Sequence, residues 1–154
     1  MVLAILLTTA LATGARLPIA DIDSGFGDRR IVLAAPGEIQ PRYGHAFGSM
    51  RIEIADSALA AGTTPLETSV AFGELRVSVP DGVGLRISAS TIFGATRLVT
   101  TTTTGDSTRV RTEELGAFSK DEVISAPGYE QAAKRIDLWV HTAFGETRVS
   151  RGQP

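Results

Sequence analysis

The sequence predicts an all-β domain of stacked strand–corner–strand repeats, arranged as a β-solenoid or as a flattened β-sandwich. Three observations support this class. A five-residue motif recurs along the chain, apolar and polar residues alternate before it, and threonine, valine, isoleucine and glycine are abundant. The 154 residues are long enough for one domain with a substantial core. We place a single β-repeat domain at residues 17–152, after a hydrophobic segment at residues 1–16.

The first fifteen residues contain no charged side chain. A membrane span needs roughly 20 apolar residues, so this run is the end of a transmembrane helix that starts upstream, a signal peptide or a buried N-terminal segment. The stretch Thr13-Gly14-Ala15 is compatible with signal cleavage, but a basic region before it is missing. We expect a location at the cell membrane, with secretion to the cell surface as the alternative. Flanking charges are too sparse to assign the side of the membrane.

Five of the six phenylalanines begin the motif Phe-Gly-x-x-Arg, at positions Phe26, Phe47, Phe72, Phe93 and Phe144. The steps between them are 21, 25, 21 and 51 residues, and the last step is close to two repeats. It leaves room for one degenerate repeat around Gly116-Ala117-Phe118. A recurring spacing of this kind indicates units that each complete the core of a neighbour.

Apolar residues alternate up to each phenylalanine and then change phase. Leu138, Val140 and Thr142 share a strand face with Phe144, whereas Leu75 and Val77 lie at odd offsets from the phenylalanine of their own motif. All can face one core only if the chain turns a corner at the Phe-Gly step, where glycine permits a positive φ. The pattern therefore predicts strand, corner and strand in each unit, with the phenylalanines stacked inside the core.

Turn-rich segments separate these units. They comprise residues 34–37, residues 56–65 and Pro80-Asp81-Gly82. Residues 100–128 form the least regular stretch. The only segment with a helix-friendly composition, residues 129–134, is short enough to predict a turn.

The repeated arginines are the first candidate for a functional surface. Arg30, Arg51, Arg76, Arg97 and Arg148 have the parity opposite to that of the core residues, so stacking would align them in an outward row. Such a row can bind phosphate or carboxylate groups. The residue two positions before is acidic in three of the five motifs, however, and a self-neutralising lattice is the competing interpretation. Trp139, the single tryptophan, also points outward by parity and completes the candidate interaction surface with Arg51, Arg76, Arg97 and Arg148.

The sequence gives little support for catalysis, for metal or cofactor binding, or for nucleic-acid binding. The chain has no cysteine, and its two histidines, His45 and His141, are predicted to point to opposite faces. No nucleophile-elbow, P-loop or dinucleotide motif occurs. A net charge of −2 gives no support for nucleic-acid binding. We expect a protein without catalytic residues, metal or cofactor.

Four segments together resemble a known family. They are Gly27-Asp28-Arg29, residues 43–48, residues 79–83 and the closing residues 138–149. Their order is similar to that of the C-terminal β-rich domain of LiaF-like cell-wall-active antibiotic response proteins. This domain, sometimes named toastrack, also follows the membrane part of actinobacterial phage shock protein C relatives. The resemblance implies a non-enzymatic module on a membrane anchor that modulates envelope stress signalling, often by restraining a sensor kinase. Family members usually begin with several membrane helices, whereas this chain shows at most the end of one.

The leading expectation is therefore a membrane-tethered interaction module in envelope stress sensing, with a sensor kinase or another membrane signalling protein as partner. One alternative is a surface-exposed adhesin-like or wall-binding module. Another is a self-assembling structural protein, because the last repeat ends abruptly at residues 151–154 and would leave an open sheet edge.

Overall fold

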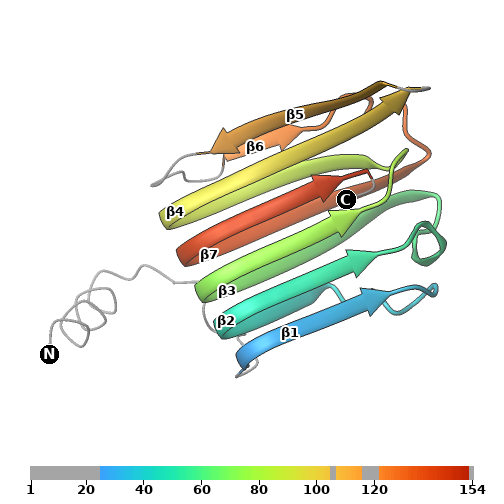
Figure 1. The fold of residues 1–154 in the computed structure, drawn as a ribbon. Helices are drawn as coiled ribbons and strands as arrows, with labels where there is room; N and C mark the ends of the chain where they lie inside the picture. Colours follow the sequence, from blue (N-terminus) through green and yellow to red (C-terminus); the bar gives the residue numbers. More distant parts are fainter. Residues whose placement is uncertain (1–24, 105–106, 116–121, 153–154) are drawn as a thin grey trace, which may run out of the picture.

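The structure is a computed structural model that describes residues 25–104, 107–115 and 122–152 (Figure 1). Its strands are β1 (Phe26–Leu33), β2 (Arg42–Ile54), β3 (Gly62–Val79), β4 (Gly84–Thr104), β5 (Ser107–Leu115), β6 (Glu122–Ser125) and β7 (Lys134–Arg151). A short 3₁₀ helix, η1 (Asp56–Ala58), follows β2. The described residues contain no α-helix, and among them nothing helical is long and apolar enough to cross a membrane.

All seven strands belong to one mixed, largely parallel sheet with the order β1-β2-β3-β7-β4-β5. The neighbouring strands in the series β1, β2, β3, β7 and β4 pair in parallel. β5 and β6 both pair antiparallel with β4. The predicted all-β class is confirmed. A regular solenoid would stack its repeats in chain order, and the described strands do not, because β7 lies between β3 and β4.

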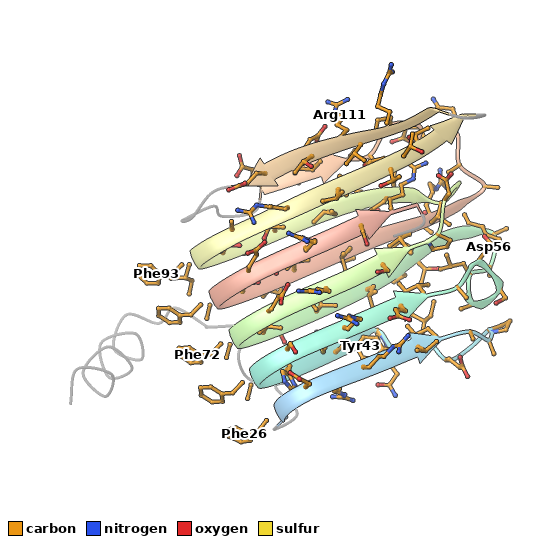
Figure 2. The ribbon with its side chains drawn as sticks, viewed as in Figure 1. Phe26, Tyr43, Asp56, Phe72, Phe93 and Arg111 are labelled. Carbon is orange, nitrogen blue, oxygen red and sulfur yellow. The ribbon has the colours of Figure 1, made fainter. Side chains whose placement is uncertain are left out.

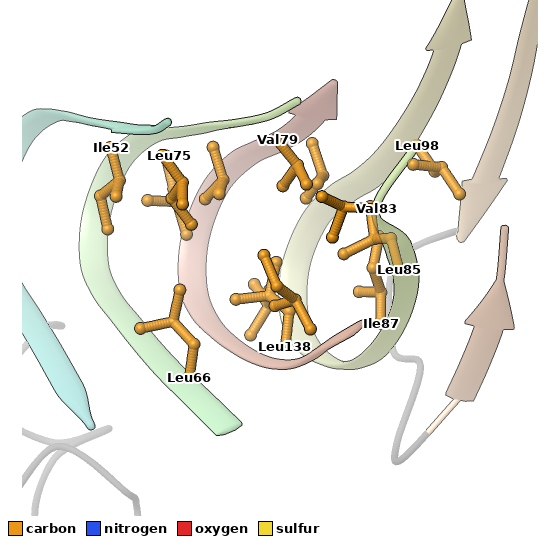
Figure 3. Packing of buried hydrophobic residues seen from close by; sticks show 14 of the residues in the cluster. Ile52, Leu66, Leu75, Val79, Val83, Leu85, Ile87, Leu98 and Leu138 are labelled. Atoms are coloured by element: carbon orange, nitrogen blue, oxygen red, sulfur yellow. The ribbon is translucent and has the colours of Figure 1, made fainter. Parts of the chain in front are cut away.

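Each long strand bends at its Phe-Gly step, as the phase change predicted. In β4 the buried side chains stop at Thr91 and resume at Thr96, with Phe93 exposed between them. Gly94 at this bend has a φ of 137°. We name the part of each strand before the bend its first arm and the part after it its second arm. Figure 3 shows Leu66 and Leu75, from the two arms of β3, on opposite sides of a shared core.

The bend explains how very short connections link parallel strands. Residues 80–83 alone join β3 to β4, although parallel strands normally need a crossover of roughly a dozen residues or more. Because β3 turns back at its Phe-Gly step, its end returns to the side on which β4 begins. The turn then needs to cross only β7, a distance of about 10 Å.

The corner glycines pack against one another across the sheet. Gly73 has a φ of 138°, and a Cβ added there would overlap the carbonyl oxygen of Gly48. The same relation holds between Gly94 and the carbonyl of Gly145. Gly27 in the edge strand β1 also has a positive φ, but a Cβ there would meet nothing within 4 Å. Interior corners thus require glycine both for backbone conformation and for space.

The core between the arms is apolar. Its fully buried side chains include Ile52, Leu66, Leu75, Leu85, Ile87 and Leu138. Immediately inside the bend the space narrows, and two pairs of threonines hydrogen-bond across it. The Oγ1 atoms are 2.8 Å apart in the Thr142–Thr147 pair and 3.1 Å apart in the Thr91–Thr96 pair.

The prediction that the phenylalanines lie in the core is wrong. Phe93 is 47% exposed, and Phe26 at the sheet edge is 77% exposed. The rings lie on the convex side of the bends and point away from the sheet (Figure 2). The reason is geometric: in β2, β3, β4 and β7 the inside of the bend is filled by the buried residues two before and three after the phenylalanine, which leaves no room for a ring.

The expected open edge at the C-terminal repeat is also wrong. β7 is paired on both sides, with β3 and with β4. The outer strands of the described sheet are β1 on one side and β5 and β6 on the other. β5 carries the charged residues Arg109, Arg111, Glu113 and Glu114, which discourage edge pairing. The predicted turn near residues 129–134 is confirmed over residues 127–131. The hydrophobic segment 1–16 and the degenerate repeat near residues 116–118 lie outside the described residues.

Candidate functional site: the arginine row

The five motif arginines occupy one line across the second arms. Sheet register places Arg30 opposite Arg51, which lies opposite Arg76; Arg76 lies opposite Arg148, and Arg148 opposite Arg97. We call this set the arginine row. The Arg97 side chain is 34% exposed and the Arg30 side chain is 64% exposed. The predicted outward alignment is confirmed, and parallel in-register pairing is its cause.

Acidic residues neutralise much of this row, as the motif suggested. Glu74 pairs with Arg76 at 2.5 Å, and Glu146 pairs with Arg97 at 2.5 Å and with Arg148 at 3.8 Å. Two further ion pairs were not predicted from the sequence. They join Arg30 to Glu53 and Arg97 to Glu114, each at 2.8 Å. Glu53 lies two residues after Arg51 and shares its strand face, so parity could have indicated it, but Glu114 comes from β5 and only tertiary pairing brings it there.

These contacts keep the carboxylates ionised. The hydrogen bond from Arg76 lowers the pKa of Glu74, against the opposing effect of partial burial. The hydrogen bond from Arg30 likewise lowers the pKa of Glu53. The guanidinium pKa values of Arg30 and Arg76 are raised by the same partners. These contacts therefore favour the charged forms of Glu53, Glu74, Arg30 and Arg76.

Arg51 is the exception within the lattice, because it makes no ion pair with any described residue. It lies between Arg30 and Arg76, beside a surface hollow of about 250 Å³. The lining of this hollow comprises Asp28, Arg29, Arg30, Ser49, Met50, Arg51, Glu74 and Arg76. Four arginines against two carboxylates give the hollow a net positive charge. Guanidinium groups so placed can receive a carboxylate or phosphate group from a ligand.

Trp139 does not join this surface. It is 40% exposed and lies on the first arm of β7, where its neighbours across the sheet are Glu67 and Ser88. The arginine row lies on the outer face of the second arms, and the core separates the two faces (Figure 3). The outward direction predicted for Trp139 is confirmed, but the structure divides the candidate interaction surface into two.

The histidines point to opposite faces, as predicted. His45 is buried inside the bend of β2, with its Nε2 2.7 Å from the carbonyl oxygen of Gly27. Its Nδ1 has no hydrogen-bond partner among the described residues. His141 is partly exposed, 3.6 Å from Glu67. Over the part of the chain that the structure describes, no three potential metal ligands gather.

The chain matches a known protein-family model. A family model described as "Cell wall-active antibiotics response LiaF, C-terminal" matches residues 40–149, which contain four of the five motif repeats and most of the arginine row. Neither a curated protein nor a solved structure matches the chain significantly.

Proposed function

The chain belongs to the LiaF-like C-terminal domain family, and from this premise we propose that it is a membrane-tethered interaction module in envelope stress signalling. The family has a role in the response to cell-wall-active antibiotics and is regulatory rather than catalytic. In the proposed role, the β domain binds a membrane signalling protein, such as a sensor kinase, and restrains it until the envelope is stressed.

The observation that carries this proposal is the hollow beside Arg51. A lattice in which every charge had an ion-pair partner within the domain would bind another protein only weakly. Its charges would already be paired, and each exposed ion pair contributes only about 0–1 kcal/mol. Arg51 makes no ion pair with a described residue, although its charge acts at longer range on Glu53 and Glu74, and it lies beside a positively charged hollow. An acidic segment of a partner protein is complementary to this site, and charge complementarity of this kind favours specific and rapid association.

The uncharged run at residues 1–15 supplies the proposed tether. It would hold the β domain close to the bilayer, where its partner is found. Tethering raises the effective concentration of the two proteins, so a modest contact at the arginine row is sufficient for regulation.

The test is a pull-down from solubilised membranes of the native host with the full chain as bait. The informative variant is Arg51→Ala, because no described ion pair is lost with it and the fold should be unaffected. Arg111→Ala is the matched control: Arg111 is an exposed arginine in β5, outside the arginine row. A Trp139→Ala bait tests the opposite face separately.

We expect a membrane signalling protein that is recovered with the native and Arg111→Ala baits and lost with Arg51→Ala. Recovery of that protein with all baits would remove the arginine row from the interaction. If only Trp139→Ala lost it, the binding face would be the first arms. Recovery of cell-wall polymer in place of a protein would favour the adhesin-like alternative, and recovery of the bait alone would favour self-assembly.

A further inference from the structure

The five motif phenylalanines, four of them exposed and Phe72 partly exposed, form a continuous ridge along the bent edge of the sheet. We call Phe26, Phe47, Phe72, Phe144 and Phe93, in their spatial order, the phenylalanine ladder. Neighbouring rings are stacked, with centroids 4.9–5.2 Å apart and planes within 12° of parallel. Phe144 is flanked by rings on both sides and is still 37% exposed. Side-to-side stacking therefore leaves the outer edge of the whole ridge in water.

An aromatic ridge of this length that is exposed to solvent is a candidate binding surface. Four strand spacings make the ladder about 19 Å long. Large contiguous apolar patches on a protein surface usually mark an interaction site. Figure 2 shows Phe26, Phe72 and Phe93 projecting from the same edge of the described sheet.

The position of the ladder in the chain points to the occupant. Phe26 begins the edge strand β1, so the described polypeptide enters the sheet at one end of the ladder. The uncharged run ends at Ala15, ten residues before Gly25. An extended linker of that length spans at most about 35 Å. If residues 1–15 are embedded in a bilayer, the Phe26 end of the ladder is held within this distance of its surface.

Charge next to the ladder fits the same occupant. Each phenylalanine is followed four residues later by an arginine of the row, and Arg29 adds a further cation near the edge strand. Aromatic rings favour the level of the lipid headgroups, and long arginine side chains extend toward lipid phosphates. Acidic residues neutralise part of the row, but Arg29 and Arg51 make no ion pair with a described residue, and cations of this kind are attracted to anionic lipids.

We propose that the phenylalanine ladder rests on the surface of an anionic lipid bilayer and orients the β domain with its bent edge toward the membrane. This inference depends on the membrane attachment proposed above. A second copy of the chain is a weaker occupant, because a ridge one side chain wide offers far less than the roughly 800 Å² per partner that a stable dimer buries.

The test uses a single tryptophan as a depth probe. The background substitution Trp139→Phe removes the native tryptophan, and Phe93→Trp then places a probe in the ladder. Val32→Trp in the same background is the control, because Val32 is exposed in β1 but lies six residues, or about 20 Å, beyond Phe26. Each full-length variant is reconstituted in phosphatidylcholine–phosphatidylglycerol vesicles that contain a spin-labelled quenching lipid.

We expect quenching of the Phe93→Trp probe to exceed that of the Val32→Trp probe at least threefold. An alkaline carbonate wash tests the tether separately from the ladder. Protein that stays on the vesicles with equal, weak quenching of both probes would overturn the ladder inference and leave the tether intact. Protein that is washed off and shows no ladder quenching beforehand would overturn both. A ladder probe that is shielded in lipid-free dimers but not quenched by lipid would assign the ridge to a second copy and contradict the proposal.

Discussion

The hydroxyl of Ser150 donates a hydrogen bond to the hydroxyl of Ser78, with the two Oγ atoms 3.2 Å apart, although 72 residues separate them in the chain. This contact joins the second arms of β3 and β7 directly. It means that the last repeat has been inserted between the third and the fourth. The C-terminal strand therefore lies within the sheet instead of at its edge. The arginine row is continuous from β1 to β4 as a result.

The first prediction concerns the corner glycines. Gly73→Ala should lower the free energy of unfolding by more than about 3 kcal/mol, because the new Cβ combines a strained φ with an overlap against the backbone of Gly48. Gly27→Ala should cost only about 1–2 kcal/mol, since its φ is strained but its surroundings are open. Urea unfolding measures both values.

A bulkier comparison tests the same corner against an ordinary strand position. Gly73→Val should lower the melting temperature far more than Ser78→Val, which lies on the outer face of the same strand. Equal melting temperatures for these two variants would show that the Phe-Gly step is not a constrained corner.

The second prediction concerns the buried threonine pair of β7. Thr147→Val should cost about 1–3 kcal/mol, because it leaves the buried Thr142 hydroxyl without its described partner. The double variant Thr142→Val, Thr147→Val should recover most of this loss. The matching positions of β3 are already the apolar Val70 and Leu75, which shows that the bend accepts such a pair. A double-mutant cycle with strictly additive losses would argue against a hydrogen bond across the bend.

The third prediction concerns alkaline pH. The Tyr129 hydroxyl donates to the Asp137 carboxylate, and this bond raises the pKa of Tyr129 above its usual value near 10. A raised pKa in the folded state contributes stability that is complete below the unfolded value and is lost as pH rises through the folded value. Between about pH 8 and about pH 11, the native chain should therefore lose more stability than the Tyr129→Phe variant does. If the free energy of unfolding fell equally with pH in the two proteins, ionisation of the tyrosine would not be linked to folding.

Local patterns were sufficient for much of the fold and of the site. The shift of parity between Val70 and Leu75 predicted a corner at Gly73, and the same count placed Arg51 and Arg76 on the outer surface. The prediction from strand parity failed for the phenylalanines, because parity assumes a continuous strand and Phe72 lies where the strand bends. A residue at a bend can follow the outer curve whatever its hydrophobicity, when smaller neighbours already fill the inside.

The remaining errors were errors of long-range pairing. Nothing in residues 134–151 indicates which two strands they separate, because all five motifs have the same register and pair equally well. The ion pair between Arg97 and Glu114 was missed for the same reason, since it depends on β5 lying beside β4. The family resemblance did indicate the correct domain, but it named no surface.

The insertion of β7 is tested most directly by cysteine cross-linking, for which the cysteine-free chain provides a clean background. Ser78 lies directly opposite Ser150, a spacing that suits a disulfide. In a stack that followed chain order, Ser78 would instead lie opposite Val99. In the structure those two residues are separated by β7, at about 10 Å between Cα atoms, which is too far for a disulfide.

Ser78→Cys with Ser150→Cys should therefore form an intramolecular disulfide under mild oxidation, seen as a mobility shift on non-reducing gels and as a cross-linked peptide by mass spectrometry. Ser78→Cys with Val99→Cys should not. Cross-linking of the second pair without the first would contradict the account, because it would place β3 beside β4 and return the last repeat to the end of the stack.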